Sequence, residues 1–248
     1  MSERPLTALI LAAGVGRRLG PAGETLPKGF LQLGTRPIIA ESLARLRRAG
    51  IERAVLVTGH HADRYAALRV DDGPRLETVH NPHFADSGSL YSWLQAAPRL
   101  AGAGYLLLES DLVYEQRALT TLVDDPADSA VLLSGPTGAG DEVWVEVDGP
   151  PAAMTLVAMA KDRARLGANI GGELVGICKI SARLHDALAA AAERLLATTR
   201  HADYESDGLV AAAAELPIPC RRVDDLLWAE IDDAAHLARA RALYPRLA

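Results

Sequence analysis

The sequence has few cysteines, few aromatic residues and no long apolar run. Two cysteines, Cys178 and Cys220, are too few for a disulfide framework in a chain of 248 residues, and they favour a reducing cytoplasm. Aromatic residues make up 4% of the chain, which leaves little material for an aromatic cage around a bulky cation. No segment reaches the ~20 apolar residues that span a membrane, so we expect no membrane partner.

Positive charge is also in short supply, because 26 lysines and arginines stand against 32 aspartates and glutamates. A nucleic-acid partner needs a basic face, so the net charge of −6 argues against one and favours a small ligand. Apolar residues make up 49% and charged residues 23% of the chain, as in an ordinary soluble enzyme. The length suits a single domain over residues 1–248.

Apolar and amphipathic segments alternate through the first half of the chain, a pattern typical of α/β folds. We expect strands at 6–11, 54–58, 75–80, 105–109 and 130–134, and helices at 37–49, 61–68, 88–97 and 115–123. After Gly135, alternation at 143–147 and 154–159 predicts an antiparallel ribbon within lid elements that cover about 136–222. Further strands are expected at 172–180 and near Cys220 and Leu226, with helices at 182–197, 207–216 and 234–243. The predicted fold is a Rossmann-like, mostly parallel sheet flanked by helices, with a small antiparallel lid ribbon.

The segment after the first strand carries the strongest functional signal. It reads Leu11-Ala12-Ala13-Gly14-Val15-Gly16-Arg17-Arg18-Leu19 and is followed by Pro27-Lys28. Glycines at the end of a strand let the main chain and its N–H groups come close to a polyphosphate. Arg18 and Lys28 add positive charge, so this loop favours an anionic ligand.

A strand followed by Gly14-x-Gly16 also opens dinucleotide-binding folds. The third glycine of that fingerprint is absent here, and Leu19 and Gly20 stand in its place. The second strand ends in Gly59-His60-His61, with no carboxylate for a ribose hydroxyl. An NAD-binding oxidoreductase stays open as an alternative from a different class.

The composite of Leu-Ala-Ala-Gly-x-Gly-x-Arg-Leu, Pro-Lys and Gly34-x-Arg36-Pro37-Ile38 resembles the signature of the nucleotidyltransferases that activate sugar phosphates and phospho-alcohols. The resemblance implies that Arg18 and Lys28 are catalytic. It also implies a set of nucleotide-binding residues: Leu11, Ala12, Ala13, Gly14 and Gly16.

A second segment, Asn81 followed by Ser87-Gly88-Ser89, resembles the cytidylyltransferases that act on phosphocholine and on 2-aminoethylphosphonate. Its Ser-Gly-Ser form looks closer to the phosphonate branch. By this resemblance Ser87, Gly88 and Ser89 border the cytosine or ribose of CTP. From the residues alone, the segment is a capped helix start.

Two aspartates at expected strand ends, Asp111 and Asp232, are candidates for a divalent metal site. Mg²⁺ prefers carboxylates together with phosphate oxygens and water. From the residues alone each aspartate could equally cap a helix, and Asp233 could cap the last helix in place of Asp232. The resemblance implies that Asp111 and Asp232 hold Mg²⁺.

The resemblance also assigns acceptor-binding residues in the second half of the chain. Asp141 and Lys161 fall in segments similar to the family's lid ribbon, where a lysine meets the acceptor's phosphate or phosphonate, and Glu173 falls in a similar strand. Tyr204 and Glu205 fall in an acidic-aromatic segment that receives an ammonium group, which a carboxylate and an aromatic ring attract. As alternatives, Lys161 is a solvated surface lysine, Glu173 pairs with an arginine, and the acidic-aromatic segment begins an exposed helix.

The sequence thus predicts a Mg²⁺-dependent cytidylyltransferase that converts CTP and a small phosphonate, 2-aminoethylphosphonate in first place, into a CMP-phosphonate and pyrophosphate. Transfer at the α-phosphorus brings anions together, so positive charge and positioning lower the barrier. Phosphocholine is the nearest alternative acceptor, and inositol or sugar phosphates are more distant. A non-catalytic nucleotide-binding module is a third class, and a homodimer stays open.

Overall fold

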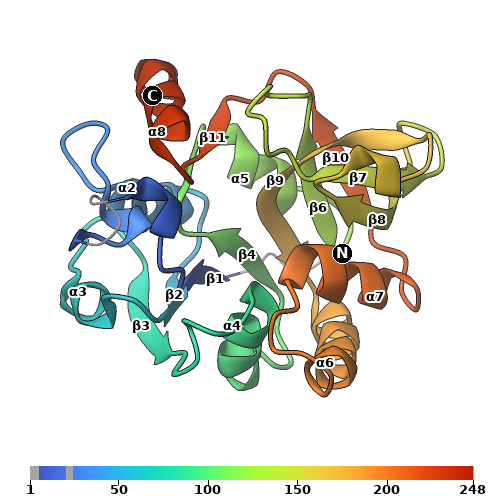
Figure 1. The fold of residues 1–248 in the computed structure, drawn as a ribbon, viewed down its shortest axis with the longest axis horizontal. Helices are drawn as coiled ribbons and strands as arrows, with labels where there is room; N and C mark the ends of the chain where they lie inside the picture. Colours follow the sequence, from blue (N-terminus) through green and yellow to red (C-terminus); the bar gives the residue numbers. More distant parts are fainter. Residues whose placement is uncertain (1–5, 21–24, 248) are drawn as a thin grey trace.

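The computed structural model describes residues 6–20 and 25–247 of the chain. A nine-stranded sheet forms its centre (Figure 1). Seven strands lie in the order β10-β6-β9-β4-β1-β2-β3, and β7 and β8 continue from β9. The strands are β1 (Thr7–Ala12), β2 (Arg53–Thr58), β3 (Arg75–His80), β4 (Tyr105–Glu109), β6 (Ala130–Ser134), β7 (Trp144–Asp148), β8 (Thr155–Ala160), β9 (Ile170–Ile180) and β10 (Cys220–Val223).

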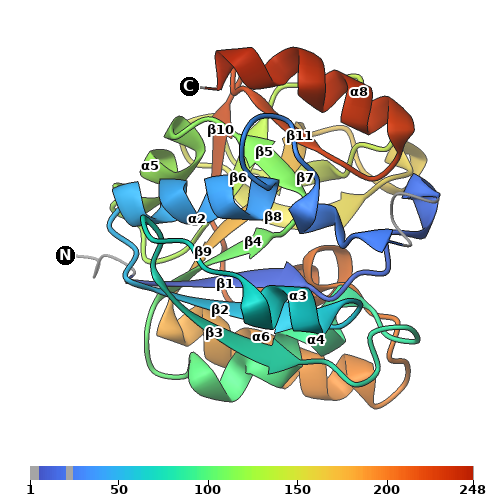
Figure 2. The ribbon, with the colours of Figure 1, turned by 90° about the vertical axis from the view of Figure 1, so that its left-hand side faces the viewer.

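Helices cover both faces of this sheet. The α-helices are α2 (Ile38–Arg48), α3 (Ala62–Ala67), α4 (Ser89–Ala96), α5 (Arg117–Val123), α6 (Ala182–Leu196), α7 (Val210–Ala213) and α8 (Ala234–Leu243). On one face, Leu9 of β1 packs in a cluster with Trp93 of α4 and Leu188 of α6. On the other face, Ile10 packs in a cluster with Leu43 of α2, and Figure 2 shows the sheet between these helix layers. Because both faces are covered, the central strands β1, β2, β4, β6 and β9 are mostly apolar.

The direction of the strands confirms the predicted fold class. β1 pairs in parallel with β2 and β4, β2 with β3, and β6 with β10, while β7 and β8 form the expected antiparallel ribbon. The strand expected at 172–180, which is β9, pairs with more strands than the sequence predicts. β9 runs antiparallel between β4 and β6 in the centre of the sheet, and its first residues pair with β7. It therefore joins the ribbon to the body of the molecule.

A separate two-stranded sheet consists of β5 (Leu112–Tyr114) and β11 (Trp228–Glu230), which pair antiparallel. β11 is the strand expected near Leu226. The sequence does not predict β5, because three residues are too few to display the alternation of a strand. Val113 and Ile231 pack with Ala240 of α8 in a third apolar cluster, which attaches the last helix to this small sheet.

The helix expected at 207–216 begins earlier and is irregular. A π-helical turn at Tyr204–Leu209 leads into the short α7, and the N–H of Gly208 donates to the carbonyl of Asp203, five residues back. Such wide turns are frequent at functional sites. Within the part of the chain described, no helix is both long enough and apolar enough to cross a membrane. The single domain with a lid over about 136–222 stays a prediction.

Candidate active site

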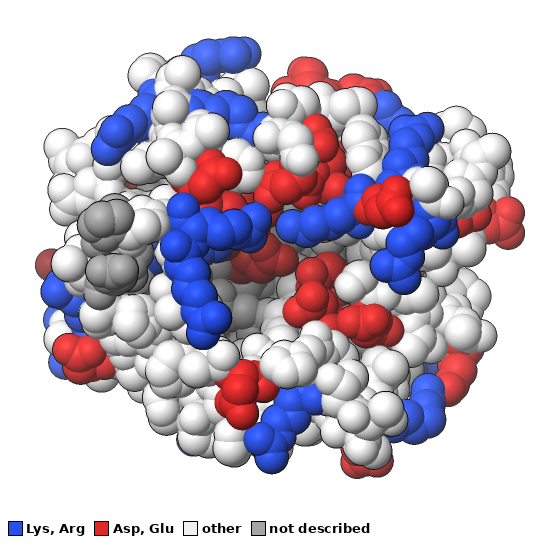
Figure 3. Space-filling view, in the orientation of Figure 1, with Lys and Arg blue, Asp and Glu red and all other residues white. Residues whose placement is uncertain are grey.

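A cavity of about 340 Å³ opens where β1 and β4 end, beside the end of β11. Ligands of parallel sheets bind beyond the carboxyl ends of the strands. Figure 3 shows basic and acidic side chains facing each other around a hollow near the middle of this face. Fourteen of the predicted site residues line the cavity: Leu11, Ala12, Ala13, Gly14, Arg18, Lys28, Ser87, Gly88, Ser89, Asp111, Lys161, Tyr204, Glu205 and Asp232.

Two predicted acceptor residues, Asp141 and Glu173, lie next to this cavity. They line an adjoining hollow of about 60 Å³ that shares part of its lining with the main cavity. Glu173 is buried and accepts hydrogen bonds from the N–H and the hydroxyl of Thr137, at 2.7 and 3.0 Å. Its hydrogen-bond partner in the described part of the chain is therefore Thr137 and not an arginine.

The loop after β1 uses its two glycines in different ways. Gly16 has a φ of 69°, in the left-handed region, and precedes the 3-10 turn that carries Arg18. At Gly14 an added Cβ would have no atom of the described chain within 4 Å. Gly16 therefore shapes the loop, whereas Gly14 leaves room for a ligand on the cavity wall.

The small sheet explains how two aspartates far apart in the sequence come together. Asp111 directly precedes β5, and Asp232 follows β11 after one residue. In the antiparallel pairing Leu112 lies opposite Glu230, and the N–H of Ile231 donates to the carbonyl of Asp111 at 3.1 Å. The pairing of β5 with β11 thus brings the two carboxylates to the same place. Asp232 does not cap α8, because the side chain of Asp233 accepts the N–H of His236 at the start of that helix.

Lys28 lies between these two carboxylates. Its Nζ donates to Oδ2 of Asp111 at 2.7 Å and to Oδ1 of Asp232. Burial alone would lower the pKa of Lys28, but the two carboxylates raise it above its usual value. Burial alone would also raise the pKa of Asp232, yet Lys28 and Arg18 hold it at about 2. Lys28 and Asp232 are therefore charged at neutral pH.

Arg18 contacts the same acidic group from the solvent side. One of its terminal nitrogens donates to Oδ2 of Asp232, and the other lies 3.6 Å from Oδ2 of Asp141. The Arg18 side chain is 57% exposed, while that of Asp232 is 2% exposed. The guanidinium group therefore remains accessible to an anion that enters the cavity.

Two carboxylates that the sequence does not single out, Glu109 and Glu230, also line the cavity. Each precedes a predicted aspartate by two residues, in Glu109-Ser110-Asp111 and Glu230-Ile231-Asp232. Residues i and i+2 of an extended chain share a face, so the repeated Glu-x-Asp spacing is the signal that could have revealed them. Burial, reinforced by the charge of Asp111, raises the pKa of Glu230 to about 8, and burial raises the pKa of Glu109 as well.

The acidic-aromatic segment closes another side of the cavity. The ring of Tyr204 is fully buried, and its hydroxyl donates to Oε1 of Glu109 at 2.8 Å. The hydroxyl of Ser89 accepts the N–H of Tyr204 at 2.8 Å and donates to Asp203 at 3.1 Å, and Oε2 of Glu205 lies 3.3 Å from it. Burial, reinforced by the charge of Asp203, raises the pKa of Glu205 to about 7.

Hydrogen bonds and a close backbone contact hold the segment before α4 in place. The buried amide of Asn81 donates to the hydroxyls of Ser87 and Ser92, at 3.1 and 3.0 Å. A Cβ on Gly88 would lie 2.2 Å from the carbonyl oxygen of Ala202, so the absence of a side chain permits this approach. The Ser-Gly-Ser segment and the residues before Tyr204 therefore form one wall.

The donor set of the cavity suits Mg²⁺. Carboxylate oxygens of Glu109, Asp111 and Glu230 lie within 4.8 Å of one another, and Asp232 shares Lys28 with Asp111. All these ligand atoms are oxygens, which Mg²⁺ prefers. In the structure the ammonium group of Lys28 supplies the compact positive charge between the two aspartates.

A family match agrees with the resemblance that the sequence predicts. The chain belongs to the family described as MobA-like NTP transferase domain, whose model matches residues 8–203. Among solved structures, the inositol-1-phosphate CTP transferase from T. maritima has a similar fold, with a TM-score of 0.79 at 19% identity over 100% of this chain and 98% of that chain.

Two relatives carry more specific names. The chain is 32% identical over 241 residues to the CMP-5'-(3-aminopropyl)phosphonate synthase of Streptomyces rubellomurinus. This match covers 92% of this chain and 37% of that protein. It is 29% identical over 106 residues to the 2-aminoethylphosphonate cytidylyltransferase of Lancefieldella rimae, and this match covers 43% of each chain. The matched segments thus cover less than half the length of each of these two relatives.

Proposed function

We propose that the chain is a cytidylyltransferase that transfers CMP from CTP to a small aminophosphonate, with 2-aminoethylphosphonate as the first choice. The observation that carries this proposal is the convergence of Arg18, Lys28, Asp111 and Asp232 on one cavity. The two relatives named for CMP-phosphonate synthesis and for transfer to 2-aminoethylphosphonate support the choice of substrates.

The reaction needs positive charge and alignment more than a protein nucleophile. An oxygen of the phosphonate attacks the α-phosphorus of CTP, the bond from that phosphorus to the bridging oxygen breaks, and pyrophosphate leaves. Lys28 and Arg18 neutralise charge on the transferring and leaving phosphates. The open space at Gly14 lets the main chain approach the triphosphate.

Asp111 and Asp232 would hold Mg²⁺, with Glu109 and Glu230 beside them. The ion, when bound, neutralises and orients phosphate oxygens. Because β5 and β11 fix the position of both aspartates, their carboxylates need no large rearrangement to serve as ligands.

The acceptor would lie between the ribbon and the acidic-aromatic segment. Lys161, on the cavity wall with its side chain 55% exposed, would meet the phosphonate. Glu205 would attract the ammonium group when its carboxyl is ionised. Asp141 and Glu173 line the adjoining hollow together with Lys161 and Glu205, and there they would border the acceptor.

Phosphocholine is the second candidate acceptor, but two rings that could meet a trimethylammonium group are already engaged. Tyr204 is fully buried, and the guanidinium group of Arg163 covers the ring of Trp144 at 5.3 Å from its centroid. An aromatic cage requires exposed ring faces. The site therefore favours a primary amine. The cytoplasmic location and the homodimer stay predictions.

Pyrophosphate release from each of the four nucleoside triphosphates tests the proposal. It would be measured with 2-aminoethylphosphonate, 3-aminopropylphosphonate, phosphocholine and inositol phosphate, with and without Mg²⁺. We expect CTP with an aminophosphonate to be the best pair. Activity with UTP and a sugar phosphate alone would contradict the substrates and leave the class intact. Binding of NAD without pyrophosphate release would contradict the class, and full activity of Asp111→Ala would contradict the site.

A further inference from the structure

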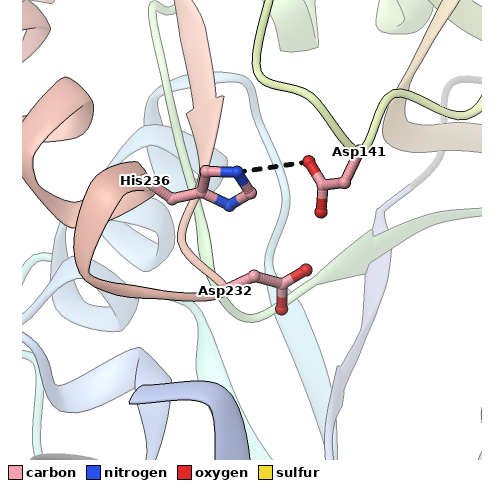
Figure 4. A group of neighbouring side chains, drawn as sticks. All are labelled: Asp141, Asp232 and His236. Carbon is pink, nitrogen blue, oxygen red and sulfur yellow. Dashed lines mark ion pairs between the residues drawn. The ribbon is translucent and has the colours of Figure 1, made fainter.

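The charged groups around the cavity have partners that hold them in position. At the start of α8, Nε2 of His236 lies 3.3 Å from Oδ1 of Asp141, beside Asp232 (Figure 4). Lys28, which also contacts Asp232, belongs to a 3-10 turn of only three residues, Lys28–Phe30. Such a short turn has few hydrogen bonds of its own, so the position of Lys28 depends on contacts with other elements.

Tyr65, from the short helix α3, reaches this turn. Its side chain is almost completely buried and lines the cavity. Its hydroxyl oxygen accepts the N–H of Gly29, and the hydroxyl group is also hydrogen-bonded to the side chain of Ser110. Gly29 directly follows Lys28, and Ser110 directly precedes Asp111. One hydroxyl group therefore joins the chain neighbours of two residues that form an ion pair.

Close packing supports the same contact. A Cβ on Gly29 would lie 2.9 Å from the Tyr65 hydroxyl and 3.3 Å from the carbonyl oxygen of Ser110, so the absence of a side chain permits this approach. The ring of Phe30 meets the ring of Tyr65 edge-on, with centroids 5.1 Å apart. Tyr65 thus contacts two of the three residues in the turn that carries Lys28.

The Tyr65 hydroxyl is suited to holding its neighbours and not to proton transfer. Burial raises the pKa of Tyr65, so the group stays a neutral phenol at neutral pH. Buried hydrogen bonds restrict the groups that they join, because breaking one leaves a desolvated polar atom. Reacting groups need close alignment, and a displacement of about 1 Å can slow a reaction about 100-fold.

We propose that Tyr65 is a positioning residue, whose hydroxyl fixes the turn of Lys28 against Ser110 and so holds the Lys28 ammonium group between Asp111 and Asp232. The inference rests on the proposed function, in which Lys28 neutralises charge on the phosphates. Tyr65 acts through Lys28 and needs no contact with the substrate.

Tyr65→Phe tests the proposal, because it removes the hydroxyl group and keeps the ring. We expect kcat for CMP transfer to fall at least about tenfold and the KM for CTP to change less than about threefold, since the positive charge stays in the cavity. Tyr105→Phe is the matched control. Tyr105 is also buried, and its hydroxyl accepts the N–H of Trp93 at the end of β4 that lies away from the cavity. This variant should keep the kcat of the wild type.

Two further measurements separate positioning from a general loss of structure. Amide hydrogen exchange of the free protein, followed by mass spectrometry, should be at least about tenfold faster in the turn of Lys28 in Tyr65→Phe and unchanged in β1. In a chain that already carries Lys28→Met, Tyr65→Phe should cause no further loss of kcat, because the two residues act together.

The exchange measurement does not depend on the identity of the substrate. If the wild type transfers no nucleotide, the proposed function fails, while faster exchange in Tyr65→Phe still supports the positioning of Lys28. Unchanged exchange in the turn, or the same fold loss of kcat with and without Lys28, would overturn the inference and leave the proposed function intact.

Discussion

Lys28 neutralises two carboxylates that are nearly inaccessible to water. The exposed fractions of the side chains are 16% for Lys28, 13% for Asp111 and 2% for Asp232. Removal of one partner from a buried ionic group leaves the other charges uncompensated, which costs about 3 to 5 kcal/mol. If the proposed function holds, stability and nucleotidyl transfer therefore depend on the same side chain at this position.

We expect Lys28→Met to lower the free energy of unfolding by about 3 kcal/mol and the rate of transfer by at least about 100-fold. Mg²⁺ should restore more stability in Lys28→Met than in the wild type, because the ion can replace the ammonium charge. Urea unfolding with and without Mg²⁺ measures both effects. Lys161→Met is the control, since its side chain is 55% exposed and should affect only acceptor binding. Unchanged stability in Lys28→Met would contradict the buried ionic group.

The raised pKa of Glu205 predicts that acceptor binding depends on pH. Burial, together with the charge of Asp203, raises its pKa to about 7, so the carboxyl is neutral below that pH and ionised above it. An ammonium group binds the ionised form, so the KM for an aminophosphonate should fall as the pH rises through about 7. Glu205→Gln should remove this part of the pH profile and raise the KM at about pH 8. An identical profile in the variant would assign the pH dependence to the substrate.

Two glycines that line the cavity, Gly14 and Gly88, play different parts. Gly14→Ala should leave the free energy of unfolding unchanged and raise the KM for CTP, because the added methyl group enters open space in the cavity. Gly88→Ala should destabilise the protein by about 1 to 3 kcal/mol, because its Cβ meets the backbone of Ala202. Thermal unfolding and initial rates distinguish the two. Equal destabilisation by both substitutions would contradict this division.

Helices and strands with a clear hydrophobic period could be predicted from the sequence. Features that depend on pairing with distant segments could not. The strands at 54–58, 75–80 and 105–109 appear within one residue of their expected bounds, because each is a complete apolar or alternating run. The central place of β9 depends on pairing with β4 and β6, which its own residues do not specify. The π-helical turn at Tyr204–Leu209 follows from a contact between Gly208 and Asp203 that no periodicity reveals.

Much of the proposed site could likewise be predicted from the motifs, since Arg18, Lys28, Asp111 and Asp232 line one cavity. Glu109 and Glu230 were missed because each lies in or beside an apolar strand, where a single carboxylate gives no pattern of its own. Proximity in space, which only the fold supplies, separates these residues from ordinary surface charges.

For the molecule as a whole, a ligand that binds the folded state should raise its stability. CTP with Mg²⁺ at a concentration 100 times its Kd should add about 2.7 kcal/mol, which is measurable as an increase in the melting temperature. UTP at the same concentration should give a smaller increase if the Ser87 to Ser89 wall selects the base. Asp111→Asn should lose most of the Mg²⁺-dependent part of the increase. Equal increases with CTP and UTP would contradict selection of cytosine at this wall.

The pairing of β5 with β11 also has a consequence for synthesis on the ribosome. β5 ends at Tyr114, whereas β11 begins only at Trp228. A nascent chain can assemble most of the large sheet before Asp232 has left the exit tunnel. The growing polypeptide therefore lacks half of its carboxylate pair, and with it the proposed site, until Asp232 has been made.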